Sequence, residues 1–394
     1  MRDMTVKELE KYRVQLFRDA TLMERKPDRV PHLANFWTWQ ILDAGYTFTE
    51  ATHDYEIMEK VMRTFHERYG FDGYQETGIR NPQRVTETLG TSQYIFDDVR
   101  ETITIKDFTL FEPDEYDLLI ADPVKFIWET ILPRKFELFN SEMPGELLRQ
   151  CALEQQAFYN ASFQRNRILA EEYGVPHLIA PFNGFISLGI EFLFTGLRGI
   201  KGLATDMHRH PEKVQEACHV LDAIIAEPVI QNYMNDKPGR HPDFCFDAIL
   251  AILAHTIMNR KQWEIFYWPT LKRILDVIVS KDKTIYLFIE GSFKRFAEYL
   301  QDYPKGHICL LVEQDDIFEI RRLLPNCCVI GGMPSALLGN GTRQQCVDYA
   351  RKLLDELGGS GGFILSQDKM ISYRTDCRRE NLLAVCEFVR EYRP

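Results

Sequence analysis

Two apolar runs in the second half of the chain each end in carboxylates. Residues 284–289 are followed by Glu290, and residues 308–312 are followed by Glu313, Gln314 and Asp315. Both runs are apolar without a polar partition, which is typical of strands that are buried on both faces. A short amphipathic segment separates them, so they predict a βαβ unit. Its strands must run parallel, and the carboxylates therefore emerge at the same edge of the sheet.

His255 adds an imidazole to these carboxylates. It lies just beyond a third candidate strand, which ends at Ile252, and adjacent barrel strands hold such side chains close together. This combination suits a divalent ion, or an acid and a base whose pKa values are driven apart by mutual repulsion. We therefore predict catalytic roles for Glu290, His255, Glu313 and Asp315, with Glu290, Glu313 and His255 as metal ligands. The alternative is that these are solvated turn residues, with Asp316 serving as a helix N-cap.

Residues near the ends of the first two candidate strands are candidates for a substrate pocket. Residues 30–36 read as the first strand and end in an aromatic and amide cluster, and a short second strand ends near Glu76. Such a cluster can floor a ligand pocket or simply cap the core. We predict that Asn35, Trp37 and Tyr74 line the pocket.

Two further pairs of residues could be interpreted as metal ligands, but their positions in the chain argue against a metal site. His208 and His210 flank a helix start that is rich in charge, which favours solvent-exposed capping residues. His307 and Cys309 form a His-x-Cys pair that is a conceivable start of a zinc site. They lie at the amino end of their strand, however, and that end of a barrel serves stability.

Composition excludes several classes of partner. The chain has 394 residues, 45% of them hydrophobic, and a net charge of -11. This acidic balance without a basic stripe argues against a nucleic-acid or anionic-membrane surface, and no apolar run is long enough to span a bilayer. The nine cysteines are scattered and odd in number, which favours reduced thiols in a cytoplasm.

Strands alternate with helices along most of the chain. About eight candidate strands, and no dinucleotide-binding glycine fingerprint after the first, predict an α/β fold of the (β/α)8 TIM barrel type. Residues 1–394 are predicted to form a single barrel domain, with an N-terminal helical extension over residues 1–25 that lies outside the barrel. Residues 79–142 lack the βα rhythm and are interpreted as an insertion after the second strand, placed to act as a lid.

Motifs spread over most of the chain resemble those of the uroporphyrinogen decarboxylase family, which in its broad sense includes cobalamin-dependent methyltransferases. Their order and spacing carry the resemblance, which implies a (β/α)8 barrel with a pocket at the carboxyl ends of the strands and, often, a dimer. The motifs are KPDRVP (26–31), YGFDG (69–73), LRGIKGLATDMHRHPEKVQEA (197–217), KQWEIFYWPTLK (261–272), LFIEGSFKRFAEYL (287–300), CVIGGMPSALLGNGT (328–342), and GGFILS (361–366) followed by REN (379–381).

The chain departs from this family at two functional places. True uroporphyrinogen decarboxylases carry an arginine-rich segment after the first strand to bind porphyrinogen carboxylates, and this chain has ANFWTWQI there (34–41). The family's zinc methyltransferases use thiolate ligands at two strand ends. The matching strand ends here carry Val312-Glu313-Gln314 and Ser366-Gln367-Asp368. Porphyrinogen decarboxylation is therefore not expected.

What the resemblance implies is a corrinoid-linked methyltransferase. It would move a methyl group from a small methylated substrate, of the aryl methyl ether or methylamine type, to a cobalamin-bearing partner, with zinc as a candidate cofactor. In this interpretation Glu290 and Glu313 are metal ligands or acids, His255 is a ligand or proton donor, and Asp315 supports them. Two alternatives stay open, a metal-independent decarboxylase of a smaller acid and a non-catalytic protein that binds a corrinoid or tetrapyrrole. We expect a cytoplasmic homodimer.

Overall fold

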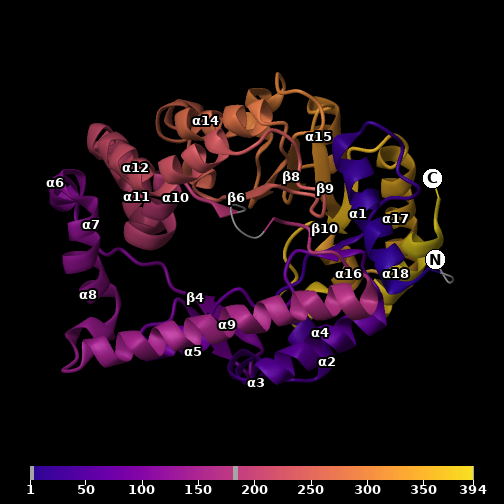
Figure 1. Ribbon diagram of the computed structural model, residues 1–394, viewed down its shortest axis with the longest axis horizontal. Helices are drawn as coiled ribbons and strands as arrows, with labels where there is room; N and C mark the ends of the chain where they lie inside the picture. The colour runs from indigo at the N-terminus through magenta and orange to yellow at the C-terminus, as the bar shows by residue number, and fades with distance from the viewer. Residues whose placement is uncertain (1–3, 181–184, 394) are drawn as a thin grey trace.

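Parallel strands form the centre of the fold. The computed structural model describes residues 4–180 and 185–393. Within them one parallel sheet has the strand order β10-β9-β8-β7-β6-β5, and β1 pairs in parallel with β2. The strands are β1 Leu33–Ala34, β2 Gly73–Tyr74, β5 Phe185–Ile186, β6 Ala248–Ile252, β7 Ile285–Ile289, β8 Ile308–Val312, β9 Cys328–Met333 and β10 Phe363–Gln367 (Figure 1).

Single bridges connect these strands around a common axis. His32 pairs with Leu365 and so joins the start of β1 to β10, and Ile179 pairs with Phe246 just before β6. Gly73 of β2 packs against Leu178, because a Cβ atom at Gly73 would lie 2.7 Å from the Leu178 side chain. Among the described residues, no backbone hydrogen bond joins β2 to residues 175–180, so side-chain packing makes that contact. The predicted (β/α)8 barrel fold is confirmed.

Helices cover the outside of the strands, and alternation along each strand separates two cores. On β7, Tyr286 and Phe288 pack inside the barrel, whereas Ile285, Leu287 and Ile289 pack outward against the helices. The α-helices are α1 Val6–Leu22, α2 Trp39–Ala44, α3 Phe48–His53, α4 Tyr55–Tyr69, α5 Gln83–Thr88, α6 Tyr116–Ala121, α7 Pro123–Phe126, α8 Leu132–Lys135, α9 Pro144–Tyr173, α10 Gly189–Phe192, α11 Gly199–Arg209, α12 Pro211–Asn235, α13 Arg260–Gln262, α14 Trp268–Ser280, α15 Ile317–Leu323, α16 Ser335–Asn340, α17 Arg343–Leu357 and α18 Arg379–Glu391.

The first helix closes the amino-terminal end of the barrel. Helix α1 begins with a capping box between Thr5 and Glu8, and its apolar face buries Phe17 and Ala20 in the same cluster as the inward-facing strand residues. The helix therefore packs against the end of the ring of strands, and the separate N-terminal extension over residues 1–25 stays a prediction. Because the helix seals this end, the other, carboxyl end is the open one.

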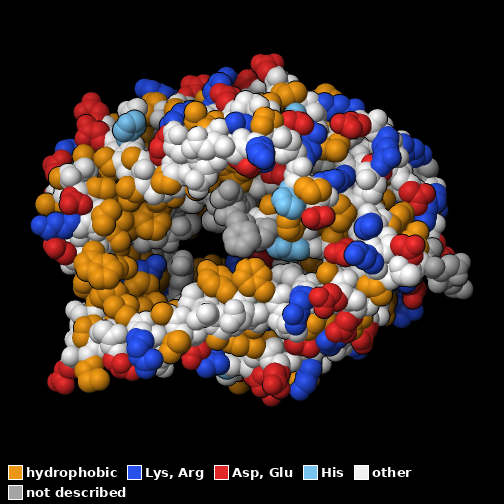
Figure 2. Space-filling view, in the orientation of Figure 1, with side chains coloured by type: hydrophobic (Ala, Val, Ile, Leu, Met, Phe, Trp, Pro, Cys, Tyr) orange, Lys and Arg blue, Asp and Glu red, His pale blue; other side chains and the backbone are white. Residues whose placement is uncertain are grey.

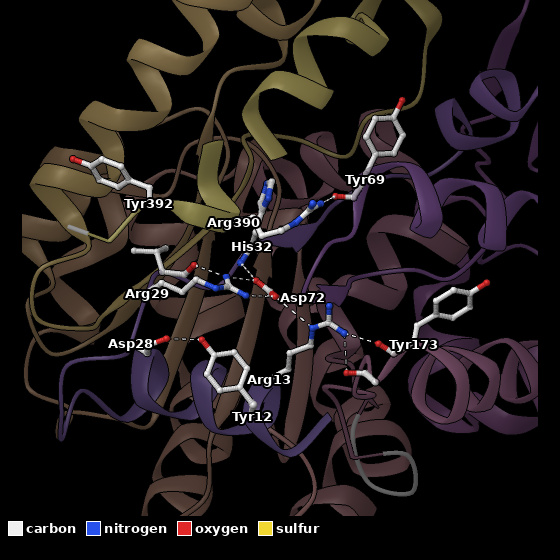
Figure 3. Close-up of polar contacts among 12 residues, drawn as sticks. Tyr12, Arg13, Asp28, Arg29, His32, Tyr69, Asp72, Tyr173, Arg390 and Tyr392 are labelled. Atoms are coloured by element: carbon white, nitrogen blue, oxygen red, sulfur yellow. Dashed lines mark hydrogen bonds and ion pairs between the residues drawn. The ribbon is translucent and has the colours of Figure 1, made fainter. Parts of the chain in front are cut away.

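A buried ion network ties α1 to the first two strands. Asp72, just before β2, accepts hydrogen bonds from Arg29 and from the backbone N–H of His32, and Arg13 of α1 lies 3.4 Å from the same carboxylate (Figure 3). Arg13 also donates to the carbonyl of Tyr173, at the end of α9. Burial alone would raise the pKa of Asp72, but Arg29 and then Arg13 hold it well below its ordinary value.

The chain makes a long excursion between β2 and residues 175–180. It contains α5, an antiparallel hairpin formed by β3 (Tyr94–Asp97) and β4 (Thr102–Ile105), the short helices α6 to α8, and the long helix α9 that returns to the barrel. Helix α6 packs against α12, and the Tyr116 hydroxyl of α6 donates a hydrogen bond to Asp206 of α11 at 2.9 Å. Helices α7 and α8 continue from α6 along one side of the molecule, and α9 runs below the gap (Figure 1). Figure 2 shows the molecule hollowed there, with hydrophobic side chains along the borders that these helices form. The lid function of residues 79–142 stays a prediction.

Membrane crossing would need a long and strongly apolar helix. Across the described ranges 4–180 and 185–393, no helix combines that length with that apolar character.

Candidate functional site

Carboxylates gather at the open, carboxyl end of the strands. Glu290 follows Tyr286 and Phe288 in the inward-facing register of β7, and Glu313 follows Cys309 and Leu311 in that of β8. Asp368 stands in the corresponding place beyond β10, in register with inward-facing Ile364. The predicted convergence of Glu290 and Glu313 is present, because the backbone N–H of Gly291 donates a hydrogen bond to Glu313.

Most carboxylates of this row hold a neighbouring turn in place. Glu313 accepts the hydrogen bond from Gly291, and Asp368 accepts one from the Ser335 backbone N–H at 2.9 Å. Glu191 of α10 accepts bonds from the Leu253 N–H at 2.8 Å and from the Tyr267 hydroxyl at 2.6 Å. These contacts fix the turns that follow β6, β7 and β9, so the open end of the barrel is built on carboxylate-to-backbone bonds.

Glu290 differs from these neighbours. In the described part of the chain, no hydrogen-bond donor or salt-bridge cation contacts its carboxylate within bonding distance, and the side chain is half-buried. Burial raises the pKa of Glu290, the nearby Glu313 carboxylate raises it further, and Arg80 lowers it in part. Glu290 is therefore a carboxyl group that retains its proton above the ordinary range and is free to donate it.

Glu191 is a second unusual acid, which sequence reasoning missed. Only 4% of the residue is exposed, and burial raises its pKa to about 7 against the opposing effect of its hydrogen-bond donors. Ionisation of the nearby Glu290 would raise it further. A lone glutamate inside the apolar run 185–194 was the signal that could have found it, because a charge in such a run must be buried and satisfied.

His255 does not join the carboxylates. Its ring is fully buried between Phe293 and Phe296, with centroid distances of 5.8 and 6.1 Å, and both of its ring nitrogens lack a hydrogen-bond partner. Burial lowers the pKa of His255 to about 4. The prediction of a metal site made by Glu290, Glu313 and His255 is wrong in this geometry, because η5 (Ala254–Ile257) turns the imidazole toward the outer aromatic core.

A set of zinc ligands is missing from the part of the chain that the structure describes. Among residues 4–180 and 185–393, no group of three or more His, Cys, Asp or Glu side chains is arranged to hold a metal ion. His307 and Cys309 lie at the amino end of β8, as predicted, and the His307 ring pairs with the carbonyl of Lys283.

Asp315 supports the turn that carries Glu290. Its carboxylate accepts hydrogen bonds from the Ser292 hydroxyl at 2.5 Å and from the backbone N–H groups of Phe293 and Lys294 at 2.6 and 2.9 Å. These bonds cap the helical turn η7 (Lys294–Leu300) and hold residues 291–294. Asp316 caps α15 by accepting a bond from the Glu319 N–H at 3.0 Å, as predicted. Asp315 is therefore placed to position the Glu290 turn.

The predicted pocket residues have three different placements. Asn35 shares the inward-facing register of Leu33; it is 1% exposed, and both polar atoms of its side-chain amide lack a partner. Tyr74 is a correction, because its ring packs against Phe65 in the outer core and its hydroxyl bonds to His66 at 2.8 Å. Gly73 takes the inward position on β2, so the next residue must point outward.

Trp37 anchors the hairpin of the excursion instead of lining an open pocket. Its ring centroid lies 5.4 Å from that of Tyr94 and 6.2 Å from that of Phe96, both on β3. Phe96 also packs on Phe48 of α3 at 5.5 Å. An indole that is 7% exposed and covered by these rings has little surface to offer a substrate.

A Phe96→Ala variant should loosen this hairpin without unfolding the barrel. Loss of two aromatic contacts is expected to reduce the local opening free energy by roughly 1–2 kcal/mol, which corresponds to hydrogen exchange about 5–30-fold faster. Hydrogen-exchange mass spectrometry over residues 94–105 measures it. Ile95→Ala, at an exposed position on the same strand, is the matched control and should leave exchange unchanged. Equal exchange in both variants would contradict the anchoring role.

Carboxylates at the carboxyl ends of parallel barrel strands are the arrangement of a TIM-barrel active site. The model of the uroporphyrinogen decarboxylase (URO-D) family matches residues 187–392, so the chain belongs to this family. The family predicted from sequence motifs is thereby confirmed. Among solved structures the chain is similar to a methyltransferase from Methanosarcina mazei, with 17% identity, a TM-score of 0.59 and 99% of each chain covered. That likeness concerns the fold. No curated protein matches the chain.

Proposed function

We propose that this protein is a methyltransferase that moves a methyl group from a small methylated substrate to the cobalamin of a partner protein. Family membership and the fold shared with a methyltransferase support the class. The observation that carries the proposal is the Glu290 carboxyl group, which has a raised pKa, lacks a hydrogen-bond donor among the described residues, and stands at the open end of the barrel.

Methyl transfer from such a substrate requires a general acid close to the heteroatom that the methyl group leaves. When a methyl group leaves an ether or amine, the heteroatom keeps the bonding electrons and is a poor leaving group until it is protonated. The Glu290 carboxyl group would donate its proton to the ether oxygen. Burial and the nearby Glu313 carboxylate raise the pKa of Glu290, and Asp315 holds the turn. Cobalamin, when bound, would supply the nucleophile that accepts the methyl group.

The shape of the molecule fits a large methyl acceptor. The hollow in Figure 2 lies between the open end of the barrel and the helices of the excursion. Those helices carry apolar side chains that are more than half exposed, namely Leu118, Val124, Trp128, Leu153, Tyr159 and Phe163. An exposed apolar set of this size is typical of an interaction surface. It supports, as part of the proposal, access for a corrinoid-bearing partner from this side.

The test is methyl transfer to reduced cobalamin, followed by the absorption change on formation of methylcobalamin. The purified protein is incubated with reduced cobalamin and, in turn, methoxylated aromatic compounds and methylamines. Methylcobalamin formation that depends on the protein supports the proposal. Carbon dioxide release from an acid without cobalamin would replace it with the decarboxylase alternative. Tight cobalamin binding without turnover would replace it with a binding role.

A further inference from the structure

Arg80 reaches into the open end of the barrel from the start of the excursion. Its guanidinium carbon lies 5.6 Å from the ring centroid of Phe288, which faces inward on β7 two residues before Glu290. The charge on Arg80 also acts on Glu290, on Glu76 and on Tyr286, three groups at or inside this end of the barrel. Arg80 therefore lies over the floor of the candidate site.

The guanidinium is incompletely paired. Its Nε lies 3.4 Å from a Glu76 carboxylate oxygen, and one terminal nitrogen contacts the Met370 sulfur at 3.0 Å. A thioether is a weak acceptor, and a guanidinium has further N–H donors in a fixed fork. The structure places no other partner on these donors within the residues it describes, and 36% of the side chain is exposed. The fork is thus available to a ligand that enters from the hollow.

The neighbouring carboxylates do not fully pair the Arg80 guanidinium. Glu313 and Asp368 are bonded to backbone N–H groups, and Glu76 makes only the one loose contact with Arg80. The same bonds leave few carboxylates free to receive a cationic substrate. A planar carboxylate fits a guanidinium fork through two parallel hydrogen bonds.

We propose that Arg80 binds a carboxylate of the substrate, so that the methyl donor is a methylated carboxylic acid. That the substrate carries a methyl group rests on the proposed function. That it carries a carboxylate rests on the contacts of Arg80. A substrate carboxylate on the fork lies on the same floor as Glu290, and the remaining part of the molecule can present its methylated oxygen to that acid. Arg80 would be a specificity-determining residue.

The experiment measures binding, so it needs no turnover and no cobalamin. Isothermal titration calorimetry is run with 4-methoxybenzoate, with anisole as the same ring without the carboxylate, and with tetramethylammonium as a cationic probe. The variant is Arg80→Met, which keeps a flexible stem over Phe288 but removes the fork. The matched control is Arg84→Met, because Arg84 follows four residues later on α5, is similarly exposed and pairs with Glu154 of α9 at 2.7 Å.

The expected result is that the wild type and Arg84→Met bind 4-methoxybenzoate, that Arg80→Met binds it at least about 10-fold more weakly, and that anisole binds all three alike. Arg80→Lys, which keeps the charge without the fork, should lose a smaller factor and serves if Arg80→Met does not fold. The inference is overturned if the wild type binds no carboxylate probe, if Arg80→Met and Arg84→Met behave alike, or if tetramethylammonium binds in preference. Carboxylate binding through Arg80 without methyl transfer would sink the proposed function alone.

Discussion

A Glu290→Gln variant is expected to lose about 10²- to 10⁴-fold of the methyl-transfer rate while it keeps the wild-type fold. The amide preserves the shape of the side chain but has no acidic proton to give the leaving oxygen. The carboxylate has no described hydrogen-bond donor, so its replacement breaks no structural contact. Initial rates of methylcobalamin formation measure the loss, and circular dichroism verifies the fold.

The pH dependence of the methyl-transfer rate is a second test of the acid role of Glu290. Burial and Glu313 raise the pKa of Glu290, so its acid form persists above the ordinary glutamate value of about 4.3. The rate should therefore be constant where Glu290 is protonated and should fall as the pH rises through the elevated pKa. Glu298→Gln, an exposed glutamate on η7, is the control and should keep both the rate and the profile. A Glu290→Gln variant with full activity would refute the acid role.

The strands that carry the site were predictable because their sequence allows one interpretation. The run predicted over 284–289 is β7 at Ile285–Ile289, and the run predicted over 308–312 has the same bounds in the structure. Continuous apolar residues between a charged segment and a turn are buried on both faces, and this fixes strand type and direction. Parallel neighbours then bring Glu290 and Glu313 to one edge without further information.

Side-chain direction was harder to predict where the strands are short. β1 and β2 each contain a pair of residues, so no alternation was visible from which to choose the face of Tyr74. The choice depends on Gly73, which meets Phe17 of α1 and Leu178, both distant in sequence. The prediction that His255 joins the carboxylates was wrong for a related reason. A helical turn follows β6 directly and directs the ring away from them.

Arg80 and Glu191 escaped prediction because tertiary contacts define them. Arg80 belongs to a segment without strand or helix periodicity, and only the packing of the excursion brings it over Phe288. Glu191 takes its donors from residues 253, 254 and 267, which lie more than sixty positions away. The residue type and the local sequence pattern do not predict such long-range contacts. Strands with continuous apolar residues, in contrast, can be predicted from the local sequence.

An Asp72→Asn variant is expected to lose about 3–5 kcal/mol of unfolding free energy, because it leaves buried guanidinium groups without their counter-charge. Arg29 and Arg13 are each less than 10% exposed and both face this carboxylate (Figure 3). The asparagine carbonyl can accept one hydrogen bond, but it cannot neutralise either cation. Urea denaturation followed by circular dichroism measures the change.

The acid response should separate this carboxylate from a surface one. The folded pKa of Asp72 is depressed, so its contribution is complete above the unfolded aspartate value of about 3.9 and is lost as the pH falls through the lower folded value. Below that window, wild type and Asp72→Asn should converge in stability. Asp28→Asn is the matched control: Asp28 accepts a bond from Tyr12 at 2.7 Å but is exposed, so its loss should stay within about 1 kcal/mol. Equal destabilisation by both variants would mean that α1 is held to the barrel by its apolar face, with Phe17 and Ala20, and not by the ion network.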